Sequence, residues 1–203
     1  TTNNTETIQK TIDKASENGG GIVTFVPGIY MTASLFVKSN VELRISEGVV
    51  LRAIQNDLLY PEIDTRIAGI EMKWPAALIN VNDQDDVRIT GKGIIDGNGE
   101  YWWKKYWGNG HGNMGGMRKD YEAKGLRWAV DYDCKRVRAV VVYESEQVAL
   151  KDITILRSGF WTISLTYSNK VHVDGVTIRN NIGGFGSSSD DIHTVSSCDV
   201  LAE

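Results

Sequence analysis

One stretch of the sequence combines aromatic and cationic side chains in a way that suits ligand binding. Residues 101 to 138 hold eight Trp and Tyr side chains, namely Tyr101, Trp102, Trp103, Tyr106, Trp107, Tyr121, Trp128 and Tyr132. Nine basic and four acidic residues between 104 and 138 give this stretch a charge of +5, in a chain whose formal net charge is −4. Flat aromatic faces beside cations suit a stacked, negatively charged ligand. The candidate binding residues here are Trp102, Trp103, Trp107, His111 and Arg118.

Two ligands fit this combination. Single-stranded nucleic acid stacks its bases on aromatic rings and passes its phosphates along Lys and Arg, but the acidic balance of the whole chain argues against it. An acidic polysaccharide fits better, because sugar rings lie flat on Trp and Tyr while uronate carboxylates meet Arg or Lys. The alternative is that Trp102, Trp103 and Trp107 only pack this insertion onto the rest of the protein.

A second group of polar side chains lies in residues 187 to 193, which contain Asp190, Asp191 and His193. From the residues alone, Asp after a run of Ser is typical of a solvated turn. His193 follows Ile192 in an alternating strand pattern, so it faces either a groove or the surface at a turn. The sequence shows no nucleophile elbow, phosphate loop or metal-spaced His pair, and we expect no metal and no cofactor.

Most of the chain repeats a pair of short alternating strands. Four copies begin at Val41, Val87, Val148 and Val171, and a partial fifth copy contains Val200. A polar dipeptide introduces most copies. The intervals between these valines are 46, 61, 23 and 29 residues. We interpret them as a unit of a little over twenty residues, with 46 as two units and 61 as two units plus an insertion of about fifteen residues.

Strand repeats of this length predict an all-β solenoid, a parallel β-helix of roughly eight coils whose inward Val, Ile and Leu side chains stack. An antiparallel sandwich is the alternative, but it needs hairpin turns and a less constant unit. Residues 3 to 18 read as a short helix that caps the N-terminal end. Nothing comparable closes the other end. We therefore expect one β-helix domain over 1–203, with a loop insertion over 101–138 and a truncated C-terminal end.

Several motifs together resemble the polygalacturonase-like family, glycoside hydrolase family 28. They are the opening GGGIVTFVPGIY at 19–30, GKGIIDGNG at 91–99 followed by Trp102-Trp103, ILRSGFWTI at 155–163, and the coil at 171–181. The resemblance covers most of the chain. It implies a right-handed parallel β-helix that hydrolyses uronate-containing polymers such as pectin with inversion of configuration.

The resemblance also implies roles for single residues. The family's Asn-Thr-Asp-Gly motif matches Ser188-Ser189-Asp190-Asp191, which makes Asp190 the catalytic carboxylate and Asp191 a second candidate. His193 stands where the family often has another acid, and we expect it to bind substrate. The family's paired-Asp motif comes about one coil later, so the resemblance implies that further catalytic carboxylates lie beyond Glu203.

Two hypotheses follow. The first is a secreted or periplasmic glycosidase of polygalacturonase type, acting on an acidic, plant-type polysaccharide. The second is a carbohydrate-binding or structural β-solenoid without catalysis, and a polysaccharide lyase on the same fold is a variant of the first. We expect no nucleic-acid partner, because the chain as a whole is acidic. We also expect no membrane partner, since no apolar run is long enough to span a bilayer. No oligomeric state is assigned.

Overall fold

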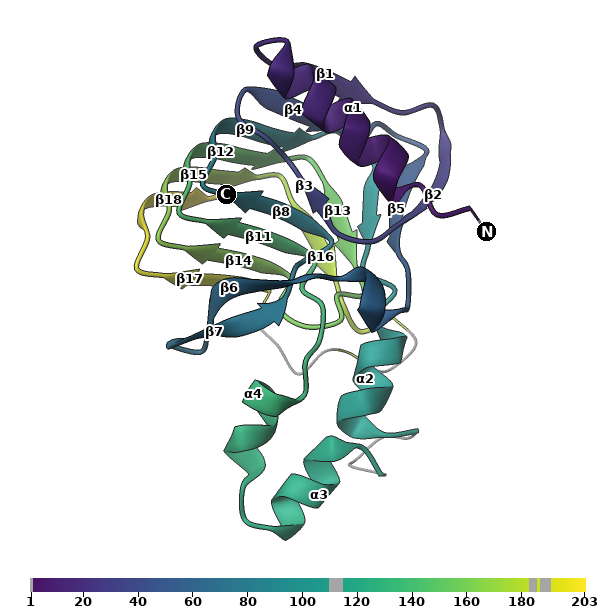
Figure 1. The fold of residues 1–203 in the computed structure, drawn as a ribbon, viewed down its shortest axis with the longest axis vertical. Helices are drawn as coiled ribbons and strands as arrows, with labels where there is room; N and C mark the ends of the chain where they lie inside the picture. The colour runs from purple at the N-terminus through teal and green to yellow at the C-terminus, as the bar shows by residue number, and fades with distance from the viewer. Residues whose placement is uncertain (1, 110–114, 183–185, 187–190) are drawn as a thin grey trace.

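The computed structural model describes residues 2–109, 115–182, 186 and 191–203. Within them, the chain forms a stack of coils, and three parallel sheets run along this stack as its faces (Figure 1). The first sheet contains β1 (Gly21–Thr24), β4 (Val41–Arg44), β9 (Asp85–Thr90), β12 (Glu146–Lys151), β15 (Asn169–Asp174) and β18 (Cys198–Ala202). The second contains β2 (Gly28–Thr32), β5 (Val49–Ala53), β10 (Ile94–Asp96), β13 (Thr154–Leu156) and β16 (Thr177–Arg179). The third contains β3 (Leu35–Phe36), β8 (Ile79–Asn82), β11 (Val140–Tyr143), β14 (Ile163–Thr166) and β17 (Ile192–Val195).

The chain passes from the first sheet to the second and the third and then returns to the first, which makes a right-handed parallel β-helix. The described residues form five complete coils, and β18 begins a sixth. The prediction of roughly eight coils was therefore wrong. Each of the two long intervals, from Val41 to Val87 and from Val87 to Val148, is a single coil interrupted by a large excursion.

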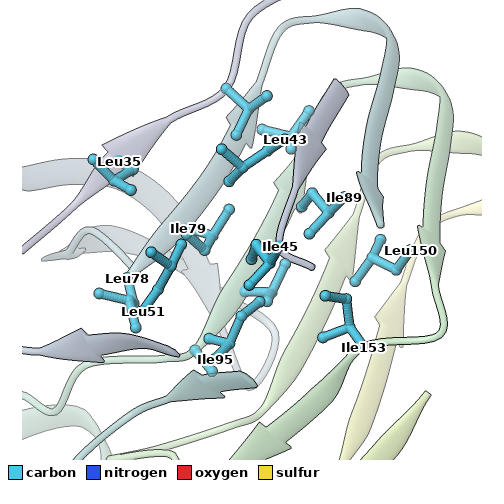
Figure 2. Packing of buried hydrophobic residues seen from close by; sticks show 14 of the residues in the cluster. Leu35, Leu43, Ile45, Leu51, Leu78, Ile79, Ile89, Ile95, Leu150 and Ile153 are labelled. Atoms are coloured by element: carbon cyan, nitrogen blue, oxygen red, sulfur yellow. The ribbon is translucent and has the colours of Figure 1, made fainter. Parts of the chain in front are cut away.

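The core lies inside the coils, where equivalent side chains stack in register. Val23, Leu43, Ile89, Leu150 and Val173 are paired in sequence along the first sheet, and all five are buried. Figure 2 shows several of these side chains meeting residues of the other sheets inside the helix. Burying one such side chain contributes about 1.5–3 kcal/mol. The alternation of buried and more exposed residues in strands such as β4 and β9 follows from this arrangement.

The helix α1 (Thr5–Glu17) covers the first coil at the N-terminal end of the stack (Figure 1). Its residues Ile8 and Ile12 are buried against the core. The helix is shorter than the predicted 3–18. Asn3 still helps to begin it, because its side-chain oxygen accepts a hydrogen bond from the Thr5 backbone N–H at 3.0 Å.

The polar dipeptides that introduce the repeats have a conformational reason. Their second residues all adopt a left-handed backbone with φ between 49° and 62°, and these residues are Asn40, Asp86, Gln147, Lys170 and Asp199. Short polar side chains such as Asn and Asp tolerate this region better than β-branched ones do. Because the same residue is left-handed in each coil, the coils stay in register.

The corner between the third and the first sheet is held by a ladder of hydroxyl groups. The Ser145 backbone N–H donates to Ser168 Oγ at 3.2 Å, and the Ser168 N–H donates to Ser197 Oγ at 3.1 Å. The Gln84 N–H donates to Ser145 Oγ in the same way. Each coil therefore satisfies a backbone donor of the coil before it. We call these residues, Gln84, Ser145, Ser168 and Ser197, the serine ladder.

The long excursions all leave from the corner between the second and third sheets, which we call the excursion corner. One runs over 54–78 and contains η1 (Asp57–Leu59) and the antiparallel hairpin of β6 (Glu62–Ile67) and β7 (Ile70–Pro75). The other, over 97–139, contains α2 (Glu100–Trp107), α3 (Met117–Ala123), η2 (Arg127–Ala129) and α4 (Val130–Asp133). Figure 1 shows both projecting from the lower side of the stack. Strands at the other two corners are joined by two to four residues.

Candidate active site

Asp191 stands at the excursion corner, directly before β17. Its side chain is exposed, and its Oδ1 accepts a hydrogen bond from Asn180 Nδ2 at 2.9 Å. Asn180 also donates to Thr162 Oγ1 at 2.6 Å and accepts from the Ser158 backbone N–H at 2.9 Å. One amide thus connects Asp191 to the preceding coil. Asp190 lies outside the described residues.

His193 lies on the outer face of the third sheet, two residues after Asp191. Its register partner in β14 is Ser164, and the ring is half-buried. Trp161 stacks on it, with ring centroids 4.2 Å apart and an interplanar angle of 27°. Phe160 stacks on Trp161 in turn, and Trp74 of β7 contacts Phe160. We call these residues, Trp74, Phe160, Trp161 and His193, the aromatic stack.

The structure separates the three tryptophans predicted to bind sugar. Trp102 is 0% exposed and donates its Nε1–H to Asp57 Oδ1 at 2.9 Å, and Trp103 is 2% exposed and donates to the Ser158 carbonyl at 2.8 Å. A sugar ring has no free face on either indole, so this part of the prediction was wrong for a packing reason: both rings fix α2 to the coils. Trp107 is half-buried, and its Nε1–H donates to the Gly186 carbonyl at 3.2 Å.

Arg118 has a structural partner on each side. Its guanidinium carbon lies 4.5 Å from the centroid of the Trp107 ring, and its Nε is 2.7 Å from Glu122 Oε1. Arg118 therefore connects α3 to α2 and carries a neutralised charge. His111, the remaining predicted binding residue of this insertion, lies outside the described residues.

The positive charge of the 97–139 excursion is largely neutralised where the structure describes it. Lys105 bonds Asp57 and Lys135 bonds Glu62, and both acids belong to the neighbouring 54–78 excursion. Other cations in the excursion remain exposed and form no ion pair among the described residues, and these are Lys104, Lys119 and Lys124. The +5 counted from sequence therefore overstates the charge available to a ligand.

Two arginines that follow α4 are completely buried, and sequence reasoning missed both. Arg136 lies between the rings of Tyr106 and Phe160, 4.1 and 4.2 Å from their centroids, and pairs with Asp131 at 2.7 Å. Burial lowers its pKa, because a low-dielectric environment disfavours the charged form. The only signal in the sequence is the closeness of these cations to the strand Val140–Tyr143.

Arg138 has a different environment from Arg136. It is 0% exposed, and within the described chain its side-chain bonds go to two hydroxyls, Thr65 Oγ1 at 3.0 Å and Ser164 Oγ at 3.4 Å. No carboxylate in the described residues pairs with it, and burial lowers its pKa to about 9. Arg138 connects the hairpin to the outer face of the third sheet, one register position from His193.

The IIDGNG string that resembles the family motif contains a buried ionic anchor. Asp96, at the end of β10, accepts bonds from Arg52 Nε at 2.8 Å and Arg157 Nε at 3.0 Å. Arg157 also pairs with Glu100 at 2.6 Å, and its bond to Asp96 raises the pKa of the guanidinium. These side chains fix the start of α2 against the next coil. Asp96 therefore positions the excursion.

The sequence and the fold of the chain were compared with those of known proteins. No family model matches the chain. An exo-poly-α-D-galacturonosidase of Dickeya chrysanthemi is 34% identical over 113 residues, which is 52% of this chain and 18% of that protein. A protein of Vitis vinifera named as a probable polygalacturonase is 27% identical over 184 residues, covering 86% of this chain and 33% of that protein. The structure of an exopolygalacturonase from Thermotoga maritima superposes with a TM-score of 0.72 at 26% identity, over 87% of this chain and 43% of that one.

These matches agree with the fold described above. The chain has the architecture of a right-handed parallel β-helix, with its excursions gathered at one corner. Two sequence relatives and this structural neighbour bear the names of polygalacturonases, and the chain is similar to that family. It spans less than half the length of each of the three proteins. Among the described residues, no helix is long and apolar enough to cross a membrane.

Proposed function

We propose that the protein hydrolyses a pectin-like, uronic-acid-containing polysaccharide, with the excursion corner as its active site. The observation that carries this proposal is the fixed position of Asp191 beside His193, in a chain whose relatives bear the names of polygalacturonases. The relatives' names favour hydrolysis over the lyase and over the non-catalytic solenoid. A charged polysaccharide cannot cross a bilayer, so we propose a secreted or periplasmic enzyme.

The proposed chemistry is inverting acid/base hydrolysis. One carboxylate activates a water molecule and another group protonates the leaving oxygen, with about 6.5–9.5 Å between the two. Asp190 takes the first role by its resemblance to the family motif, and Asp191 is the second candidate. Asn180 donates to Asp191, and this bond fixes the position of the exposed carboxylate. Neighbouring coils are about 4.8 Å apart, so acids on consecutive coils can bracket one glycosidic bond. No residue of this chain is assigned as the general acid.

Substrate binding is assigned to the surroundings of Asp191. His193 on Trp161 offers a half-buried aromatic surface next to Asp191. Trp107 donates to the carbonyl of Gly186, which stands four positions before Asp190 in the sequence, and we propose that it shapes this side of the site. The exposed Lys104 supplies positive charge for uronate groups on the same excursion.

The test is an assay of the full-length protein on polygalacturonate with the variants Asp190→Asn and Asp191→Asn. We expect at least one of them to lower kcat by about 10²- to 10⁴-fold, because the amide cannot take a proton from water. Proton NMR of the first product should show an anomeric configuration opposite to that of the substrate. Asp13→Asn in α1 is the matched control and should keep full activity. Full activity in both site variants would contradict the assignment.

A further inference from the structure

Trp128 is the one tryptophan with an exposed ring among those that the structure describes. It is 67% exposed, whereas Trp102, Trp103 and Trp161 are buried. It lies in η2, between α3 and α4. Figure 1 shows α3 and α4 at the far end of the excursion, away from the coils. A large aromatic side chain so exposed to water is a common feature of binding surfaces.

The ring of Trp128 is connected to the candidate active site through other side chains. It contacts Tyr132 edge to face, with ring centroids 6.5 Å apart. Tyr132 packs on the cluster that contains Trp161, and its hydroxyl donates to the Ala68 carbonyl at the tip of the hairpin at 3.3 Å. Trp161 in turn stacks on His193. Aromatic side chains thus lead from Trp128 to the surroundings of Asp191.

The surroundings of Trp128 are positively charged. Residues 117–128 contain four basic and two acidic side chains, a net charge of +2 in a chain of net charge −4. Lys119, Lys124 and Arg127 are exposed, and the ion pair of Arg127 with Glu122 is loose, at 3.5 Å. Other strongly exposed apolar residues, such as Leu58 at 93%, are aliphatic. A flat ring with neighbouring cations is complementary to a sugar ring that carries a carboxylate.

We propose that Trp128 and the cations of α3 and η2 form a remote subsite for a uronic-acid polymer, several sugar units away from Asp191. This inference rests on the proposed function. The apolar face of a sugar ring stacks on the indole, and the uronate of the same or the next unit pairs with Lys124 or Arg127. The subsite contacts only long substrates, so it raises the affinity for polymers without changing the chemical step.

The experiment compares Trp128→Ala with the unmodified full-length protein on galacturonate oligomers of increasing length. We expect KM for long polymers to rise about fivefold, the usual effect of one lost aromatic contact, while kcat and the kinetics on di- and trimers stay unchanged. Leu58→Ala is the matched control, since it removes an exposed apolar side chain without a ring. Thermal unfolding of both variants should match that of the parent protein.

Three results would overturn the proposal. Equal KM values for Trp128→Ala and the parent on long polymers, in an active enzyme, would remove the subsite and leave the proposed function intact. A sedimentation profile that changes from dimer to monomer in the variant would show that Trp128 contacts a second copy of this chain. A parent protein that neither binds nor cleaves polygalacturonate would end both proposals.

Discussion

The excursion corner and the serine ladder belong to the same coils but follow different rules. At the serine ladder each coil places a hydroxyl or amide under the backbone of the coil before it, and the connections are two to four residues long. At the excursion corner the connections range from the two residues 33–34 in the first coil to the helical excursion 97–139. The backbone pairing that stacks the coils ends before this corner, so the corner accepts insertions and unlike side chains at little cost.

The two corners also satisfy their polar groups differently. The ladder uses neutral hydrogen bonds, each contributing about 1 kcal/mol net. The excursion corner uses ions, with Asp96 between Arg52 and Arg157, and Arg136 between two rings. Such ionic contacts depend on exact partners and vary from coil to coil. The corner that varies is the corner that carries the candidate active site, as expected where a rigid scaffold supports variable loops.

The largest difference in unfolding free energy should appear when one glycine is replaced by alanine in a tight corner and another is replaced in an excursion. Gly91, in the tight corner after β9, has φ of +109°, and a Cβ there would lie 2.3 Å from the Ile45 carbonyl oxygen. Gly69, at the hairpin tip, has φ of +89° and nothing within 4 Å. We expect Gly91→Ala to cost about 3 kcal/mol or more and Gly69→Ala about 1 kcal/mol, measured by urea unfolding. Equal costs would show that the tight corners are no stricter than the excursions.

The ladder itself should show an intermediate effect. Ser168→Ala removes the acceptor of the Ser145 N–H and the donor to the Thr166 carbonyl, both buried. The orphaned N–H should lower the free energy of unfolding by about 1–2 kcal/mol. Ser16→Ala in α1 is the control, because that hydroxyl reaches the Ser39 carbonyl only at 3.5 Å. A loss as small as that of the control would mean that pairing alone holds the coils.

The smallest change is expected at the excursion corner, where Arg138→Met replaces a buried charge by an apolar side chain. At pH 7 Arg138 is charged in both states, and burial opposes that charge in the folded protein. The Met variant should therefore unfold with a free energy within about 1 kcal/mol of the parent or above it. Arg138→Ala, which leaves a cavity, should lose about 2 kcal/mol or more.

The pH dependence of this pair follows from the pKa of Arg138, which burial lowers to about 9 in the folded protein, well below the pKa of the free guanidinium. Between these values the unfolded chain holds the proton and the folded chain has released it, so the stability of the parent rises with pH. Any advantage of the Met variant in urea should thus shrink from pH 7 to pH 10. A constant difference would show that Arg138 keeps its proton over this range.

Much of the regular architecture could be predicted from sequence. Val41, Val87, Val148, Val171 and Val200 all lie at equivalent places in the first sheet, as their spacing indicated. The count of coils could not be predicted, because an alternating hairpin such as β6–β7 has the same period as the strands of a coil. Intervals of 46 and 61 residues therefore resembled additional units.

The candidate site, too, could be predicted from the sequence only in part. The sequence alone determined which residue types could do chemistry and where they cluster, because type and local period belong to each segment by itself. Tertiary structure decided that Trp102 and Trp103 are buried, that Trp128 is exposed, and that Arg138 has only hydroxyl partners. Burial and ion pairing depend on the segments that fold over a residue, and those come from distant parts of the chain. A side chain's availability to a ligand is thus a property of the folded stack.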